Sequence, residues 1–399
     1  MKNEMTSKER ILHTMEWKAT DYVPLTINGI CHTSVVDLNK KLGRDPFKIA
    51  GYCIELGTDT GMQIGLPLVF PPDIEIQYKT QRIPGEKDDI LTKEYITPKG
   101  KLIQAVRKNE HYPFDEIPVF SDHLVSSERS YRYMIDSTQG LCALEYLFSE
   151  PGPKHEEAAY AKAWEFAKET KKFADSHDII MSGNLTGIGD PLLWLSGVEN
   201  IVYMGADEPE ALHRYIGILS EWNIRNLKTL IDMGVDTVIR RGWYESTDFW
   251  SPEMYREFLL PALKKEVQAA HSAGIKYSYI MNTGVDALAG LIKEAGVDTQ
   301  TNAEPEKCDI IGLREVFNNK VAMCTGINNY HVLEEGDEND IENAVIYALE
   351  NYAAGGGFIL CPSDSVGGVG LSSGSISEKN IENVHFLVKA WKRERGKFK

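Results

Sequence analysis

Residues 275–304 read IKYSYIMNTGVDALAGLIKEAGVDTQTNAE, and this unit decides the fold. A strand candidate, IKYSYIMN (275–282), is followed by a helical pattern and then by a second strand candidate, VDTQTNAE (297–304). Gly274 and Gly296 stand just before the two strands, where a preceding helix would end in a left-handed cap. This order predicts parallel strands joined by a crossover helix.

The same unit recurs along the second half of the chain, where DMGVDT at 232–237 nearly repeats EAGVDT at 294–299. Further strand candidates are DIIMSGN (178–184), VDTVIRRG (235–242), KVAMCTGI (320–327) and GFILCPSD (357–364), with DYVPLTI (21–27) and a weaker GTDTGMQI (57–64) near the start. Eight strands are then within reach. Because no G-x-G-x-x-G follows the first strand, we expect an α/β fold of the TIM (β/α)8 barrel type and not an open doubly wound sheet.

Between the second and third expected strands of the barrel, the sequence pattern changes to one typical of antiparallel β-structure. IEIQYKT (74–80) alternates, and EYITPKGKLIQAVRK (94–108) predicts a hairpin that turns at 98–100. We expect a single domain over residues 1–399, with a β-hairpin insertion at about 66–125 that covers the barrel mouth.

Composition limits the partners. With 42% hydrophobic and 26% charged residues, the 399-residue chain can bury a large core, and its net charge of −16 argues against nucleic acid. No stretch approaches the roughly 18 apolar residues of a membrane helix, so we expect a cytoplasmic protein without a membrane partner. Six cysteines without a C-x-x-C pair indicate reduced thiols.

In such barrels the active site lies at the C-terminal ends of the strands. The polar, aromatic or thiol residues at or just after the expected strands are Asn28, His32, Asn184, Arg240, Arg241, Trp243, Tyr244, Glu245, Tyr279, Asn282, Asn302, Glu304, Asn328, Cys361 and Asp364. Any one of them can be a satisfied structural group. Their convergence on one rim is the stronger argument for a site.

The run GWYESTDFWSPEMYREF (242–258) is the most informative part of this rim. SPE at 251–253 is a helix start, which leaves WYESTDFW as a loop with the carboxylates Glu245 and Asp248. Such a loop suits a flat organic ligand with one proton-transfer group, whereas the alternative is that its tryptophans only pack on the rim.

The chain resembles the uroporphyrinogen decarboxylase superfamily, TIM-barrel proteins that include decarboxylases and the methyltransferases serving corrinoid proteins. The resemblance covers nearly the whole length and rests on TSKERILHTMEWKATDYVPL (6–25), the 94–108 hairpin, SPEMYREFLLPALKKEVQAAHSAG (251–274), and the strands around IMNTG and GVDTQTNAE. The first and third of these segments are fairly specific to the superfamily, and the others support them.

Two branches of this superfamily match less well. The decarboxylases carry an arginine-rich stretch after the first strand that holds the substrate's carboxylates, but NGICHTSVV (28–36) has no arginine, and the negative net charge would repel a polyacid. Zinc-dependent members carry H-x-C and a later cysteine, whose places hold Tyr279, Met281 and Asp364 here. Tyrosine and methionine are poor zinc ligands, so the resemblance makes zinc doubtful and leaves an irregular set of Asp364, Cys361 and Glu245 as the alternative.

The remaining branch takes a methyl group from a methoxylated compound, often an aryl methyl ether, and passes it to the Co(I) corrinoid (cobalamin) of a partner protein. The resemblance therefore implies an O-demethylase methyltransferase of anaerobic one-carbon metabolism, with the corrinoid protein docked at the C-terminal rim. The departing oxygen needs a proton, for which Glu245 is the first candidate and Tyr279 the second.

The substrate-binding set expected for this reaction is Asn28, His32, Asn184, Arg241, Trp243, Tyr244, Asn282, Asn302, Asn328, Cys361 and Asp364. A thiol methyltransferase with an irregular metal site and a non-catalytic binding barrel remain as alternatives. The methyl donor, the cognate corrinoid protein and the oligomeric state stay open.

Overall fold

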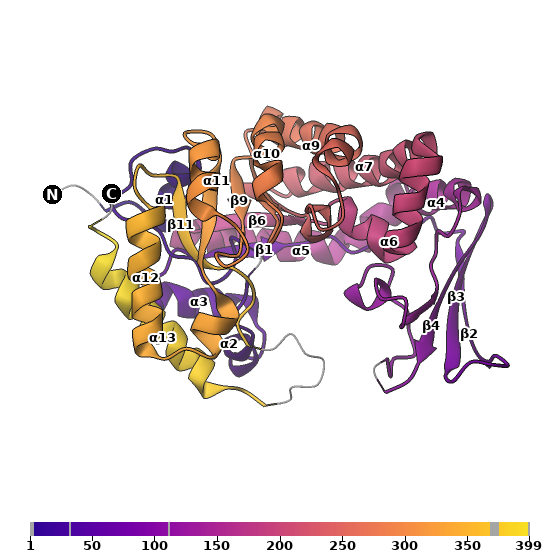
Figure 1. Ribbon diagram of the computed structural model, residues 1–399, viewed down its shortest axis with the longest axis horizontal. Coiled ribbons are helices and arrows are strands. Elements are labelled where there is room, and N and C mark those ends of the chain that lie inside the picture. The colour runs from indigo at the N-terminus through magenta and orange to yellow at the C-terminus, as the bar shows by residue number, and fades with distance from the viewer. Residues whose placement is uncertain (1–3, 32, 111, 368–374, 398–399) are drawn as a thin grey trace.

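The computed structural model describes residues 4–31, 33–110, 112–367 and 375–397 (Figure 1). Within them, a curled parallel sheet has the order β1 (Gly61–Ile64), β6 (Ile180–Leu185), β7 (Thr237–Arg241), β8 (Lys276–Ile280), β9 (Thr299–Thr301), β10 (Ala322–Ile327) and β11 (Phe358–Pro362). This sheet order follows the chain order. The predicted α/β fold is confirmed, and the curled sheet is TIM-barrel-like.

The expected first strand at 21–27 is reduced to an isolated parallel bridge between Leu25 and Leu360. On its other side, the Leu25 carbonyl accepts a hydrogen bond of 2.8 Å from the Asp59 amide, just before β1. This segment therefore lies between the two edges of the sheet. A ladder is interrupted here because Pro24 has no amide hydrogen to donate.

Helices follow the strands, as the pattern predicted. They are α5 (Pro153–His177), α6 (Gly189–Asp207), α7 (Pro209–Asp232), α8 (Pro252–Met254), the π-helix η4 (Tyr255–Leu259), α9 (Leu260–Ser272), α10 (Ala289–Ala295), α11 (Ile310–Phe317), α12 (Glu338–Tyr352) and α13 (Glu378–Glu394). Gly274 and Gly296 adopt φ values of 75° and 83°, as expected of left-handed caps. Among the described helices, none is long and apolar enough to cross a bilayer.

The N-terminal end of the sheet is covered by α1 (Ser7–Met15). Three further α-helices lie between α1 and α5 in the chain: α2 (Val36–Lys41), α3 (Pro46–Leu56) and α4 (Leu141–Leu147). Ile11 and Met15 of α1 pack against Ile180 and Ile359 of the sheet. Arg10 on the same helix pairs with Asp59 at 2.5 Å and so ties α1 to the start of β1. A ligand is therefore expected at the opposite, C-terminal ends of the strands.

The insertion is an antiparallel sheet of β2 (Glu75–Arg82), β3 (Asp89–Thr97), β4 (Gly100–Lys108) and β5 (Ser130–Arg132). The β3–β4 turn confirms the predicted hairpin. The sheet packs against α4 and lies at the end of the molecule away from both termini in Figure 1. The short helix η1 (Asp122–Leu124) brings one residue of the insertion, Asp122, to the strand ends.

Candidate functional site at the strand ends

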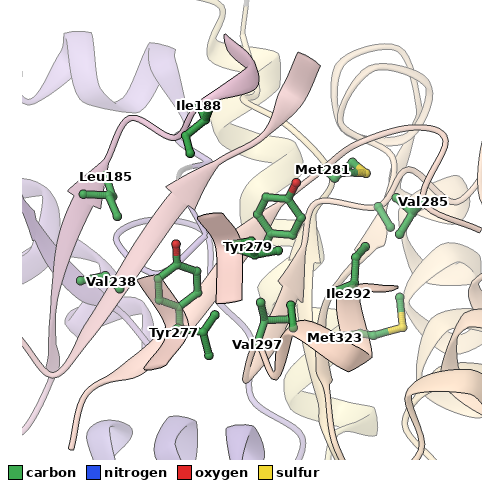
Figure 2. Close-up of a cluster of buried hydrophobic side chains, with 14 of the residues drawn as sticks. Leu185, Ile188, Val238, Tyr277, Tyr279, Met281, Val285, Ile292, Val297 and Met323 are labelled. Atoms are coloured by element: carbon green, nitrogen blue, oxygen red, sulfur yellow. The ribbon is translucent and has the colours of Figure 1, made fainter. Parts of the chain in front are cut away.

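The alternation of strand side chains decides which residues reach the barrel interior. Arg240 pairs in register with Tyr279, and Arg241 pairs with Ile280. Tyr277 and Tyr279 belong to a cluster of buried side chains between the sheet and the helices (Figure 2). There the Tyr277 hydroxyl donates to Glu266 of α9. Side chains of the opposite parity, such as Asn282, turn to the mouth.

The mouth holds a cavity of about 690 Å³. Its lining residues come mainly from the ends of β1, β7, β8, β9 and β11 and are Asn28, Thr33, Ser34, Asn39, Gln63, Asp122, Trp243, Tyr244, Asn282, Asn302, Glu304, Asp364 and Ser365. This set contains amides, hydroxyls, aromatic rings and carboxylates, and no lysine or arginine occurs among these lining residues. The cavity therefore suits a polar, largely uncharged ligand better than a polyanion.

Three amides of this lining have a buried atom without a hydrogen-bond partner among the described residues: Gln63 Nε2, Asn282 Oδ1 and Asn302 Oδ1. The other end of two of these side chains is fixed. Asn282 Nδ2 donates to the Ser363 carbonyl at 3.1 Å, and Gln63 Oε1 accepts from Asn184 Nδ2 at 3.3 Å. Folded proteins leave few such atoms unpaired, so the mouth offers one donor and two acceptors to a ligand.

Asn302 also has an unusual backbone conformation, with φ at 70° directly after β9. Its amide donates to the Cys324 carbonyl at 2.9 Å, which holds this turn against β10. Asparagine tolerates the left-handed region better than most residues, and such conformations are concentrated at functional sites. The turn aims the Asn302 side chain into the mouth.

Asp364 is the carboxyl of the mouth that is best suited to carry a proton. It follows β11 and reaches the cavity at an exposed edge, and the protein atoms on its other sides raise the pKa of its carboxyl through partial desolvation. The Ser365 amide donates to Asp364 Oδ1 at 2.7 Å, which partly opposes that effect. The other two acids are already engaged, since Asp122 accepts from the Tyr244 hydroxyl at 2.9 Å and Glu304 accepts from Asn328 at 3.1 Å.

Glu245 is fully buried beside the mouth and does not line it. One carboxylate oxygen accepts from the Ile188 and Gly189 amides at 3.2 and 2.6 Å, which caps the start of α6. The other accepts from Arg240 and, at 2.5 Å, from the Tyr279 hydroxyl. Because these contacts are all with protein donors, the geometry favours a positioning role over the acid role that the sequence suggested.

Arg240 is the centre of this buried network. Its Nε donates to Glu266 at 3.1 Å, and the two carboxylates raise the pKa of the guanidinium well above its usual value despite its burial. The hydroxyl of Tyr279 points into this network and not into the cavity. A hydrogen bond from Tyr279 to a ligand in the mouth, as the sequence suggested, is therefore not supported by this arrangement.

Six of the predicted binding residues line the cavity: Asn28, Trp243, Tyr244, Asn282, Asn302 and Asp364. Asn184 lies behind Gln63, and the Arg241 guanidinium lies 5.6 Å from the Trp243 ring centroid. Asn328 caps the π-helix η6 (Asn329–Glu334), and Cys361 lies inside the barrel. His32 lies outside the described residues.

Six lining residues were not predicted from the sequence: Thr33, Ser34, Asn39, Gln63, Asp122 and Ser365. Gln63 stands near the end of the strand expected at 57–64, so the rule of strand ends would have found it. Asp122 reaches the mouth from the insertion, and no local sequence pattern predicts this contact.

The places of the family's zinc ligands do not form one site. Tyr279 and Met281 are fully buried on the helix side of β8, whereas Asp364 is in the mouth. The irregular set is also divided, because Cys361 is inside the barrel and Glu245 is in the network with Arg240. Neither donor set fits a zinc ion.

A second hollow, of about 770 Å³, lies on the outside of the molecule between α8, η4 and the helical segment η5 (Asp286–Leu288) with α10. Its lining includes Glu253, Arg256, Glu257 and Leu291. Because this hollow is lined only by helical residues and by none of the residues at the strand ends, the mouth is the candidate site.

The chain is similar to a known protein family and, in fold, to a solved methyltransferase structure. The family model described as uroporphyrinogen decarboxylase (URO-D) matches residues 180–393. A methyltransferase from Methanosarcina mazei has a TM-score of 0.62 at 17% identity, covering 98% of this chain and 99% of that chain. A D-psicose 3-epimerase from Clostridium cellulolyticum H10 has a TM-score of 0.35 at 13% identity, covering 57% of this chain and 81% of that chain. No curated protein sequence matches the chain.

Proposed function

Because the chain belongs to the uroporphyrinogen decarboxylase (URO-D) family, we propose that it is a methyltransferase built on a TIM (β/α)8 barrel whose first strand is reduced to a bridge. It takes the methyl group of a methoxylated, aromatic donor and delivers it to the corrinoid of a partner protein. The shared fold with the Methanosarcina mazei methyltransferase along nearly the whole chain supports this proposal.

The lining of the mouth carries the proposal. A porphyrinogen is a polycarboxylate, and this cavity has acids and amides but no lysine or arginine among its lining residues. A methoxyarene is flat and largely uncharged, and the aromatic residues Trp243 and Tyr244 of the lining offer it apolar ring surface. The unpaired atoms of Gln63, Asn282 and Asn302 then hold its polar substituents.

The protein's own chemistry is orientation and proton supply. As the bond between the methyl carbon and the ether oxygen breaks, the oxygen takes both electrons and needs a proton, since a bare phenolate is a poor leaving group. Asp364 is our choice for this proton because it reaches the cavity and its pKa is raised. Glu245 and Tyr279 act behind the site by fixing the loop that carries Trp243.

The partner's reduced corrinoid supplies the nucleophile when bound. The methyl group has to be accessible to it, and the N-terminal end of the barrel is covered by α1. We therefore place the partner over the C-terminal rim, where the mouth opens.

The test combines the purified protein with a reduced corrinoid and a panel of methoxyarenes, and it measures released phenol together with the corrinoid absorbance. We expect phenol only when donor, protein and corrinoid are all present. Donor binding without any phenol would indicate the non-catalytic barrel, and methylation of an added thiol alone would indicate the thiol methyltransferase.

Variants then locate the proton donor. Asp364→Asn should lower turnover by roughly 10²-fold or more and flatten the pH profile, with donor binding largely kept. Asp248→Asn is the matched control, since Asp248 is an exposed carboxylate of the 242–250 loop that does not line the cavity. If Glu245→Gln loses turnover with unchanged stability while Asp364→Asn keeps it, the acid is Glu245.

A further inference from the structure

Three cysteines from distant parts of the chain meet inside the barrel, away from the network of Arg240. They are Cys31 of the segment after the reduced first strand, Cys324 of β10 and Cys361 of β11. All three are fully buried, and their sulfur atoms lie within 4.8 Å of one another. The mouth cavity is close by, because the hydroxyl of its lining residue Thr33 lies 2.8 Å from Cys31 Sγ.

The three sulfurs are close enough together to share one cation after a small adjustment. With zinc–sulfur bonds of about 2.3 Å, the sulfur atoms of a tetrahedral site lie about 3.8 Å from one another. The three sulfurs here all lie within 4.8 Å of one another. Cys31 and Cys361 are at 2.8 Å, so a bound ion would move these two sulfurs apart by about 1 Å.

The surroundings favour a closed structural site over a reactive one. The cluster packs against apolar side chains, including Met15, Ile180 and Ile359, so solvent does not reach the sulfurs. Its polar contacts are the Thr33 hydroxyl and the Pro362 carbonyl, which accepts from the Cys361 thiol at 3.0 Å.

An open hydroxyl lies next to the cluster. Thr301 of β9 pairs in register with Cys324, and its hydroxyl is buried without a partner among the described residues. Thr33 and Thr301 thus add two oxygen donors beside the sulfurs, and a bound ion or its coordinating water would satisfy the second of them.

We propose that Cys31, Cys324 and Cys361 bind one thiophilic cation, Zn²⁺ or Cu⁺, inside the barrel. The thiols give up their protons on binding. Three thiolates around Zn²⁺ leave one net negative charge, which the Thr33 hydroxyl stabilises by donating to Cys31. This site differs from the family's zinc places at Tyr279, Met281 and Asp364, and it does not depend on the proposed methyl transfer.

The cation would cross-link the barrel where its hydrogen bonding is weakest. The segment after Leu25 makes one bridge to β11 in place of a full strand, and Cys31 lies on its continuation. The same segment carries Asn28, Thr33 and Ser34 to the mouth. Binding therefore closes the sheet and fixes one wall of the cavity.

The experiment measures metal directly. Full-length protein is purified from cells grown with zinc and, separately, with copper, under reducing conditions, and its metal content is determined by mass spectrometry. We expect about one equivalent per chain, and the two cultures distinguish Zn²⁺ from Cu⁺. Refolding with Co²⁺ should give the intense near-ultraviolet absorption of cobalt–thiolate bonds.

Cys31→Ser and Cys361→Ser should each lower the metal content at least tenfold and remove the cobalt–thiolate band. Cys53→Ser is the matched control, because Cys53 is buried but lies outside the cluster. The proposal is overturned if the wild-type protein holds no metal after both growths and after refolding with Co²⁺. It is also overturned if only four of the six thiols react after unfolding without reductant, which would reveal a disulfide.

Discussion

Arg240 and Arg241 are neighbours in sequence, yet they lie in opposite environments. Arg240 is fully buried on the helix side of β7, between Glu245 and Glu266. Arg241 is half-buried on the other face, between the rings of Trp194 and Trp243, and its Nε has no partner among the described residues. A shift of one residue along a strand thus separates a filled network from an open mouth.

The difference indicates separate roles for the buried network around Arg240 and for the mouth. The carboxylates of the network are bound on both oxygens by protein donors, so it fixes the loop of Trp243 and has little left to offer a ligand. The amides of the mouth keep donors and acceptors unpaired. Stability should therefore depend mainly on the network, and ligand binding mainly on the mouth.

The largest expected effect is on the network. Arg240→Met keeps much of the side-chain volume but leaves Glu245 and Glu266 as buried carboxylates without a cationic partner, which should cost about 3–5 kcal/mol of unfolding free energy. Urea denaturation measures it. Arg256→Met is the control, because Arg256 makes an exposed ion pair with Glu294 that solvent screens, so its loss should cost far less.

The triple variant Arg240→Met, Glu245→Gln, Glu266→Gln sharpens this test by removing all three charges together. It should recover part of the loss, since the penalty comes from unpaired charge. Arg241→Met should cost far less than Arg240→Met while it changes donor binding. Equal costs for the two single variants would abolish the distinction between the two faces.

The second prediction concerns Asp190, which is buried where the two regions meet and accepts from the Tyr244 amide at 2.9 Å. Burial raises its pKa to about 7, so the folded protein holds a proton that the unfolded chain releases near pH 4. This group's contribution to stability is therefore complete below pH 4 and is lost as the pH rises towards 7.

Asp190→Asn removes that titration and keeps an acceptor for Tyr244. Between pH 5 and pH 8 the wild-type protein should lose about 2–3 kcal/mol relative to the variant, as measured by urea denaturation across pH. A constant difference between the two proteins over this range would show that Asp190 does not hold the proton.

The sequence predicted much of the fold because helical patterns and capping glycines are local signals. The parallel strands from 178 to 364 and the hairpin were found in this way. The reduced first strand was not, because an apolar run shows nothing of how many ladder bonds form around Pro24.

The candidate site was predicted less well, because alternate residues of a strand point to opposite faces of the sheet and the sequence does not show which face is which. The expectation that sites lie at strand ends correctly placed Asn28, Asn282 and Asn302 at the mouth. It did not say on which face of the sheet the side chains of Tyr279 and Glu245 lie. Only the strand register shows that Tyr279 shares a face with Arg240. The contribution of Asp122 is a tertiary contact, which no pattern within the insertion encodes.

The smallest expected effect is at Asn302, where two variants distinguish the contribution of the backbone conformation from that of the side-chain amide. Its φ of 70° disfavours alanine by about 1–2 kcal/mol relative to glycine, so Asn302→Ala should be less stable than Asn302→Gly by that amount. Both variants remove the amide from the cavity and should weaken donor binding equally. Asn319, which is exposed at φ 56°, is the matched control: its alanine and glycine variants should show a similar stability difference and no change in binding. If donor binding follows the stability of the Asn302 variants instead, the turn after β9 matters to the ligand through its backbone, and the open amide of the mouth does not contribute.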